Sequence, residues 1–339
     1  MSNSNQPTSI PQLPNLKGQR VLITGGLGFI GSNVAHKCLE LGADVTIYDC
    51  MDPHSGGNMY NIHDIKDSVE LVLGDVLDFH ELSRYIVRQD IIFNCAASTS
   101  HPFSMREPLI DLDVNSKGVI NLLEAARRFN RDIKIIHIGT STQLGRLCFN
   151  PADETHPEFP TDIYSANKSA SEKYVLIYGK AYQLSVTVLR LSNVFGPRAT
   201  IKSSEFTFNN YFIGLALQGK EICIFGEGSQ LRNIIYVDDC VAALIMASQN
   251  DKARGEVFFC VGNKHYSVAE IAKAITHYIG SGSVRFIEWP EERKAIEIGD
   301  AVISNEKIKN ALGWEPHYDV ATGLIKTKEY YSCCLKKYL

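Results

Sequence analysis

A short apolar strand that runs into a glycine-rich turn and then a helix constrains this chain more than any other feature. Residues 20–24 (RVLIT) are rich in β-branched side chains and stop at glycine, which predicts a buried strand. Residues 25–31 read Gly-Gly-Leu-Gly-Phe-Ile-Gly, and a helical pattern continues through Leu41. Glycines permit a tight turn and let the backbone approach a pyrophosphate, while the helix N-terminus offers free N–H groups. This context predicts a dinucleotide site.

The end of the next expected strand indicates which dinucleotide the site takes. Residues 44–48 form a second β-branched run that ends at Asp49, 18 residues after Gly31. An acid at this distance can bind the ribose hydroxyls and repels a 2′-phosphate. The sequence therefore favours NAD over NADP.

Strands and helices continue to alternate, which predicts an α/β fold with a doubly wound parallel sheet. Further strands are expected at residues 69–73, 91–94, 134–138 and 186–191, and a long helix at 113–130. Parallel strands with helices on both faces bind ligands beyond their carboxyl ends. The hydroxyl cluster at residues 140–142 follows such an end, so we expect it on the same side of the sheet as the glycine-rich turn.

Small and polar residues at other strand ends extend the expected cofactor site. Asp75 follows the strand at 69–73 and can bond the adenine amino group, while Ala96 and Ala97 leave room for a cofactor against the backbone. Asn115 lies on the long helix, where it is either solvated or a buried polar group that needs a partner.

A tyrosine and a lysine four residues apart supply candidate acid–base chemistry. Tyr164 and Lys168 open an expected helix that continues through Tyr174, and residues four apart share a helix face. A tyrosine hydroxyl titrates near ~10, and a nearby ammonium lowers this pKa by favouring the phenolate. The pair can accept the proton of a substrate hydroxyl, although Tyr-x-x-x-Lys also arises by chance on exposed helix turns.

The second half of the chain continues with shorter elements. Helices are expected at residues 206–218, 239–247 and 268–279, followed by two closing helices, and strands at 222–225, 233–237, 256–261 and 284–287. Asp238 and Asp239 are expected to cap the helix that follows them, and Ser267 with Glu270 has the pattern of a capping box. The charged run at 291–294 is expected to be a solvated loop.

Composition and charge argue against several classes of function. A chain of 339 residues suggests two domains at ~150 residues each. The net charge of −4 and the absence of long apolar runs argue against binding to nucleic acids and against any association with membranes. Residues 1–15 are rich in Ser, Asn, Gln and Pro and are expected to be a disordered tail. The nine scattered cysteines indicate free thiols in a reducing cytosol, and no metal site is expected.

A series of sequence features occurs in one order along the chain. They are Thr24-Gly-Gly-Leu-Gly-Phe-Ile-Gly31, Asp49, Gly74-Asp75-Val76, Asn115, Thr140-Ser-Thr142, Tyr164-x-x-x-Lys168, the run from Arg190 to Arg198 and the run from Gly226 to Asp239. Together they resemble the extended short-chain dehydrogenases/reductases that act on nucleotide sugars, over residues 16 to about 331. The resemblance implies a Rossmann domain (16–191 plus 233–262) and a smaller α/β domain (192–232 plus 263–331) that binds the nucleotide sugar. It also implies bound NAD, a cytoplasmic location and a homodimer joined by a four-helix bundle that includes the Tyr164 helix.

The resemblance assigns roles residue by residue. Tyr164 is the general base, Lys168 modulates its pKa and binds the ribose, and Thr140 polarises the reacting sugar oxygen. The implied cofactor contacts are Gly25, Gly28, Phe29, Ile30, Gly31, Asp49, Asp75, Val76, Ala96, Ala97, Asn115, Tyr164 and Lys168. The implied substrate contacts are Thr99, Thr140, Ser141, Thr142, Asn193, Arg198, Arg232 and Arg293, with Asn193 and Arg232 on the diphosphate.

Departures from the family pattern concern the substrate. Leu144 replaces the usual tyrosine before Gly145, the Asn94–Cys95 stretch replaces a histidine, the loop at 50–61 does not match, and Arg293 matches only loosely.

Ser141 and Thr142 stand where related 4,6-dehydratases carry Asp-Glu and decarboxylases carry a glutamate. The sequence therefore favours an epimerase acting at C4 of a UDP-hexose or UDP-hexuronic acid. The alternatives are a dehydratase or decarboxylase that uses His101 or Glu154, a net oxidoreductase that releases NADH, and a non-catalytic NAD-binding protein.

Overall fold

A seven-stranded parallel sheet dominates the computed structural model, which describes residues 13–291 and 297–339. Its strands are β1 (Arg20–Thr24), β2 (Asp44–Asp49), β3 (Glu70–Leu73), β4 (Ile91–Asn94), β5 (Lys134–Thr140), β6 (Ser185–Leu191) and β10 (Val257–Cys260). They lie in the order β10-β6-β5-β4-β1-β2-β3, and every pair is parallel. The order reverses direction at β1, so the carboxyl ends of β1 and β4 form the switch point where such sheets bind ligands. The predicted doubly wound sheet is confirmed.

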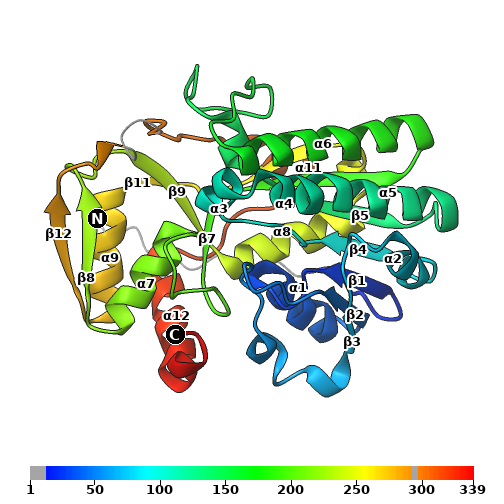
Figure 1. Ribbon diagram of the computed structural model, residues 1–339, viewed down its shortest axis with the longest axis horizontal. Helices are drawn as coiled ribbons and strands as arrows, with labels where there is room; N and C mark the ends of the chain where they lie inside the picture. Colours follow the sequence, from blue (N-terminus) through cyan, green and yellow to red (C-terminus); the bar gives the residue numbers. More distant parts are fainter. Residues whose placement is uncertain (1–12, 292–296) are drawn as a thin grey trace, which may run out of the picture.

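Helices cover both faces of this sheet, as Figure 1 shows. One face is covered by α1 (Phe29–Glu40) and α8 (Val237–Gln249), and the other by α2 (Phe79–Ile86), α5 (Gly118–Phe129) and α6 (Ile163–Tyr182). Successive residues of β1 therefore enter different cores, because strand side chains alternate between faces. Leu22 packs with α2, α5 and α6, whereas Ile23 packs with α1 and α8. Burial on both faces explains the uninterrupted apolar runs in the sequence.

The rest of the chain forms a smaller α/β region at the left of Figure 1. It contains a three-stranded sheet of β7 (Asn193–Phe195), β9 (Leu231–Tyr236) and β11 (His265–Ser267), and a two-stranded sheet of β8 (Glu221–Phe225) and β12 (Ser283–Ile287). Its helices are α7 (Phe208–Leu217), α9 (Val268–Ile279) and α12 (Val320–Cys334), while α11 (Glu306–Leu312) packs near β10. Residues 233–236, expected in the first domain, pair with β7 and β11 instead. The other boundaries of the two expected domains stay a prediction.

One long helix expected at 113–130 is divided in the structure. Helices α3 (His101–Arg106) and α4 (Pro108–Leu112) precede a π-helical turn (Asp113–Lys117) that leads into α5. Pro108 suits the first turn of a helix, which explains the earlier start. Short 3₁₀ segments lie at Met59–Ile62, Lys66–Ser68, Ser141–Leu144, Asp251–Ala253 and Leu335–Lys337.

The ends of two helices test the capping predictions. Ser267 and Glu270 form the predicted capping box at the start of α9. The predicted cap of α8 is wrong, because the helix begins at Val237 with Tyr236 at the N-cap position. Asp239 instead accepts hydrogen bonds from the backbone N–H groups of His317 and Tyr318, at 2.7 and 3.0 Å. This carboxylate joins α8 to the segment before α12, a long-range contact that no local pattern reveals.

Three predictions fall wholly or partly outside the described residues. Arg293 and most of the charged run at 291–294 lie in the undescribed stretch 292–296, and the tail at 1–15 is described only from Leu13. Leu13 packs against the core, and Leu16 is fully buried. The described part of the expected tail therefore packs against the folded chain.

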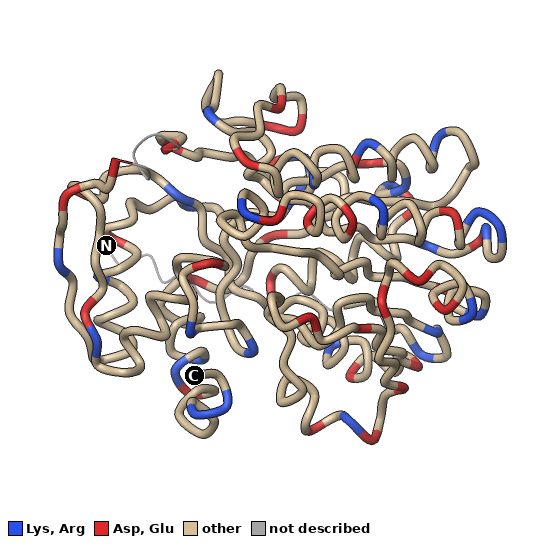
Figure 2. Tube along the Cα trace, in the orientation of Figure 1, with Lys and Arg blue, Asp and Glu red and all other residues tan. Residues whose placement is uncertain are grey.

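Figure 2 shows that basic and acidic residues are interspersed along the outer helices of the large sheet. No helix within residues 13–291 and 297–339 is long and apolar enough to cross a membrane. All nine cysteines are free, as predicted.

Candidate active site

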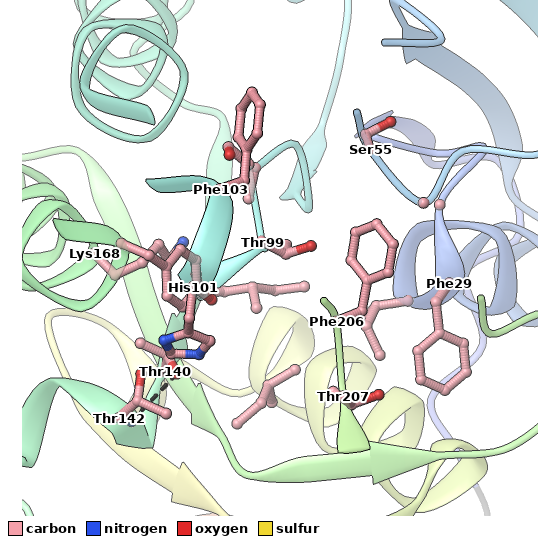
Figure 3. Close-up of a pocket in the computed structure, with 18 of the residues that line it drawn as sticks. Phe29, Ser55, Thr99, His101, Phe103, Thr140, Thr142, Lys168, Phe206 and Thr207 are labelled. Atoms are coloured by element: carbon pink, nitrogen blue, oxygen red, sulfur yellow. Dashed lines mark hydrogen bonds between the residues drawn. The ribbon is translucent and has the colours of Figure 1, made fainter. Parts of the chain in front are cut away.

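A cavity of about 1160 Å³ lies at the carboxyl ends of the parallel strands, between the large sheet and the smaller region. Small-molecule sites commonly enclose about 300–1,000 Å³, so this cavity has room for more than one ligand group. The sheet side contributes Gly25, Asp49 and Thr140, and the smaller region contributes Asn193 and Arg232. Figure 3 shows side chains from both sides, including Phe29, Thr140 and Phe206, converging on it.

The glycine-rich turn leaves its backbone open to the cavity. Gly25 has φ +66°, and a Cβ atom there would lie 2.7 Å from the backbone nitrogen of Ala96. A Cβ atom at Gly31 would collide with the carbonyl oxygen of Gly25. Gly28, at the N-cap of α1, has no side chain to satisfy the first N–H groups of the helix. These N–H groups suit a pyrophosphate, so the turn fits a dinucleotide.

Gly25→Ala is expected to weaken NAD binding at least about tenfold, because the turn must move away from Ala96 and lose its close approach. Gly219→Ala is the matched control, since Gly219 also has positive φ (+68°) but nothing within 4 Å of the added Cβ atom. Both substitutions strain the backbone, so only the difference between them reports on the turn. Equal NAD affinity in the two variants, measured by calorimetry, would contradict this reading.

Asp49 connects the glycine turn to the end of β2. Its carboxylate accepts hydrogen bonds from the backbone N–H groups of Leu27 (3.0 Å) and Met51 (2.8 Å). Burial raises the pKa of Asp49, although these two bonds act in the opposite direction. Each carboxylate oxygen keeps a further lone pair, so Asp49 could still accept hydrogen bonds from ribose hydroxyls.

The structure brings most of the expected cofactor residues to this cavity. Its walls include Gly25, Gly28, Phe29, Ile30, Gly31, Asp49, Asp75, Val76, Ala96, Ala97, Tyr164 and Lys168. Asn115 is not among them: it is buried, and its amide donates to the carbonyl of Ser98 at 2.8 Å. Asn115 therefore supports the cavity wall indirectly, through its hydrogen bond to Ser98.

Most of the expected substrate residues also line the cavity. They are Thr99, Thr140, Ser141, Thr142, Asn193 and Arg232. Arg198 does not, because its guanidinium donates to the Asn33 side chain (2.8 Å) and the Asn61 carbonyl (3.2 Å). Arg232 lies at the cavity but is paired with Glu297 at 2.7 Å. An incoming diphosphate would have to displace the Glu297 carboxylate or share the Arg232 guanidinium with it.

Tyr164 and Lys168 occupy the first turns of α6. The helix starts there because the carboxylate of Asp162 caps it, accepting from the Ser165 backbone N–H at 2.8 Å. The Lys168 ammonium donates to the Ile138 carbonyl at 2.5 Å. Burial lowers the pKa of Lys168 to about 8, and the negative charge of Asp111 acts against this shift.

Burial also raises the pKa of Tyr164 above its ordinary value, while a hydrogen bond with Thr140 acts against it. Loss of hydration therefore dominates the pKa of Tyr164 in this structure and outweighs the lowering effect expected of Lys168. Thr140 lies within hydrogen-bond distance of Thr142 (3.0 Å), as Figure 3 shows, and Thr142 in turn of Ser165 (2.8 Å). Tyrosine, lysine and hydroxyl groups thus converge at one end of the cavity.

Sequence reasoning missed the partner of His101. Nδ1 of His101 lies 2.8 Å from the Asp162 carboxylate, and both residues line the cavity beside Tyr164. An aspartate two residues before the tyrosine, at the start of its helix, was the available signal. Glu154, the other candidate acid or base, does not line the cavity, and its carboxylate accepts from the Phe259 N–H at 2.7 Å.

Known proteins share both the sequence pattern and this architecture. Residues 21–268 match the family described as the NAD dependent epimerase/dehydratase family. The UDP-glucose 4-epimerase of Mycolicibacterium smegmatis is 31% identical over 321 residues, covering 92% of this chain and 98% of that protein. The dTDP-D-glucose 4,6-dehydratase of Mus musculus is 29% identical, covering 94% and 90%. These relatives catalyse different reactions at similar identity, so similarity alone does not select one.

A solved structure gives the same result for the fold. The UDP-glucose 4-epimerase of Thermotoga maritima, determined with UDP-glucose, superposes with a TM-score of 0.84 at 29% identity. The superposition covers 93% of this chain and 99% of that one. The likeness therefore extends through both the large sheet and the smaller region.

Proposed function

Because the chain belongs to the NAD-dependent epimerase/dehydratase family, we propose that it is a nucleotide-sugar epimerase that inverts C4 of a UDP-hexose or UDP-hexuronic acid. The observation that carries this choice is the turn after Thr140. Ser141 and Thr142 present only hydroxyl groups to the cavity, and neither can serve as the strong acid or base that elimination of water requires. Inversion through a transient 4-ketone needs only one acid–base group.

Tyr164 is the general base in this proposal. Its hydroxyl accepts the proton of the sugar C4 hydroxyl and later returns it. Bound NAD supplies the acceptor for the hydride that leaves C4. The ammonium of Lys168 favours the phenolate and holds a ribose hydroxyl, and Thr140 positions the reacting oxygen.

The remaining site residues bind and orient the two ligands. The glycine turn and Asp49 hold the pyrophosphate and the adenosine ribose, because N–H groups and a carboxylate complement those parts. Arg232 and Asn193 hold the sugar diphosphate, since the arginine fork matches phosphate oxygens. The ketone has to rotate between the two hydride transfers, so that its opposite face receives the hydride. The size of the cavity permits this rotation.

A homodimer and a cytoplasmic location complete the proposal. Apolar side chains of α4 and α6 are exposed, including Leu109 (73%) and Ile177 (56%), and pairing of α5 and α6 with a second copy would cover them. Nine free thiols suit a reducing compartment.

Mass spectrometry and chromatography of nucleotide sugars, after incubation with the protein and NAD, test the reaction. UDP-glucose, UDP-N-acetylglucosamine and UDP-glucuronate, with their GDP, CDP and dTDP counterparts, are the substrates to compare. A new isomer of unchanged mass supports the epimerase. Loss of water or carbon dioxide overturns it in favour of a dehydratase or decarboxylase, and release of NADH favours a net oxidoreductase.

Asp111→Asn is expected to move the alkaline limb of the pH–rate profile to lower pH. The buried Asp111 carboxylate raises the pKa of Lys168 and so opposes the lowering effect of burial. Removal of this charge is therefore expected to move the pKa of Lys168 from about 8 to a lower value. The ammonium then loses its proton at lower pH, and activity falls earlier as pH rises. Profiles of kcat/KM for both proteins give the measurement, with the exposed Asp132→Asn as control. An unmoved limb would show that Lys168 does not set it.

A further inference from the structure

His101 is a titratable group at the reactive end of the cavity that a C4 epimerase does not need. It begins α3, lines the cavity, and its ring centroid lies 4.7 Å from that of Tyr164. Figure 3 shows its imidazole at the same end of the cavity as Thr140 and Thr142. The histidine therefore lies next to the groups that would hold the reacting sugar carbon.

Asp162 fixes which nitrogen of His101 is available. The Asp162 carboxylate can only accept hydrogen bonds, so Nδ1 of His101, 2.8 Å away, carries the proton. Burial alone would raise the pKa of Asp162, but the bonds from His101 and Ser165 outweigh it and lower this pKa, which keeps the carboxylate ionised. Nε2 is then the ring nitrogen that this bond leaves available. Within residues 13–291 and 297–339, no side chain or backbone group hydrogen-bonds to Nε2.

The same carboxylate orients the neighbouring hydroxyl groups. Ser165 donates to Asp162 at 3.1 Å, so Thr142 must donate to Ser165, and Thr140 must donate to Thr142. Each hydroxyl proton is thus directed toward Asp162. Apart from the catalytic tyrosine, His101 is a side chain at this end of the described cavity whose second ring nitrogen can accept a proton from a ligand.

A ketone at C4 makes such a base chemically useful. Hydrogens on the carbons beside a carbonyl group are acidic, because the electron pair left by the proton is delocalised onto the carbonyl oxygen. Inversion at C4 does not use these hydrogens. A base beside Tyr164 can remove such a hydrogen, which the tyrosine cannot do because it is engaged with the C4 oxygen.

We propose that His101, oriented by Asp162, is a second acid–base residue that removes and returns the proton on a sugar carbon adjacent to the C4 ketone. This inference rests on the proposed function, which forms the ketone. Nε2 takes the proton, the C–H electron pair becomes the C=C bond of an enolate, and the carbonyl π pair moves to oxygen, where the Tyr164 hydroxyl stabilises the charge. Return of the proton restores the ketone. The imidazole is 36% exposed, so its proton exchanges with water between the two steps.

Deuterium incorporation tests this role separately from hydride transfer. A nucleoside diphosphate 4-keto-6-deoxyhexose is added to the protein in D₂O, and deuterium on the ring carbons is followed by mass spectrometry and NMR against a protein-free sample. The wild type is expected to accelerate exchange beside the ketone, and His101→Gln to lower that acceleration at least about 100-fold. Glutamine can still donate to Asp162, so the cap of α6 is retained.

Two further variants separate catalysis from folding. His277→Gln changes an exposed histidine on α9 that does not line the cavity, and is expected to exchange like the wild type. His101→Ala is expected to regain exchange when free imidazole is added, which a structural role would not produce. Thermal unfolding of each variant checks that it is folded.

The outcomes distinguish this inference from the proposed function. Exchange no faster than in the protein-free sample, or equally fast in His101→Gln, overturns the role of His101. C4 inversion of UDP-hexoses is measured in parallel and tests the proposed function independently of His101. Accelerated exchange that is lost in His101→Gln supports the second acid–base residue even if no UDP-hexose is inverted.

Discussion

Tyr164→Phe is expected to lower kcat by about 10²–10⁴-fold, the usual contribution of a general acid–base group, while NAD remains bound. The substitution deletes one oxygen atom and keeps the ring. The ring is 8% exposed and packs against His101, so phenylalanine should occupy the same space. The Asp162 cap of α6 and the Lys168 contact with the Ile138 carbonyl involve other atoms and should persist. The loss should therefore fall on catalysis rather than on folding.

The control for this prediction is Tyr182→Phe at the far end of α6. Tyr182 is 41% exposed, and its ring contacts Arg127 rather than the cavity. Turnover of the nucleotide sugar identified by the substrate comparison and NAD affinity by calorimetry should be measured for both variants. Activity within tenfold of the wild type in Tyr164→Phe would remove the tyrosine from the role of base. Loss of NAD binding would mean that the hydroxyl serves the cofactor instead.

The parts of the fold that the sequence predicted are those with local signals. The β1 strand, the glycine turn and α1 follow one another directly, and the turn requires glycine at Gly25 because of its positive φ and its contact with Ala96. Burial on both faces makes each strand of the large sheet a continuous apolar run. Tyr164 and Lys168 share a helix face by spacing alone. Each of these features depends on only a few neighbouring residues.

The parts that the sequence did not predict depend on residues far apart in the chain. Asp239 is a helix cap by local pattern, yet it binds backbone groups 78 and 79 residues later. Asp162 and His101 are 61 residues apart, and only the packing of α3 on α6 brings them together. The pKa of Tyr164 depends on burial, which spacing does not express. Long-range pairing and the loss of hydration therefore mark the limit of local reasoning.

A buried ion pair beneath the site should account for the largest effect on stability. Arg190 on β6 donates to both carboxylate oxygens of Glu172 on α6, at 2.6 and 2.8 Å, and to Glu158 at 2.6 Å. The side chains of Arg190 and Glu172 are 4% and 2% exposed. Glu172 follows Lys168 by one helical turn, so the pair also anchors the catalytic helix to the sheet.

Arg190→Met is expected to destabilise the protein by about 3–5 kcal/mol, because it leaves the carboxylate of Glu172 buried without its closest charged partner. Removing both charges with Arg190→Met and Glu172→Leu should recover most of that loss, since an apolar pair of similar volume avoids the cost of burying either ion. Urea unfolding followed by circular dichroism measures the difference.

Arg20→Met is the matched control for that substitution. It breaks an ion pair with Asp90 whose side chains are 50% and 40% exposed, and water can solvate the carboxylate that remains. Its unfolding midpoint should stay close to that of the wild type. An Arg190→Met midpoint equally close to the wild type would mean that the buried pair contributes no more than a surface pair. A double variant no more stable than Arg190→Met would assign the loss to packing around β6 rather than to the unpaired charge.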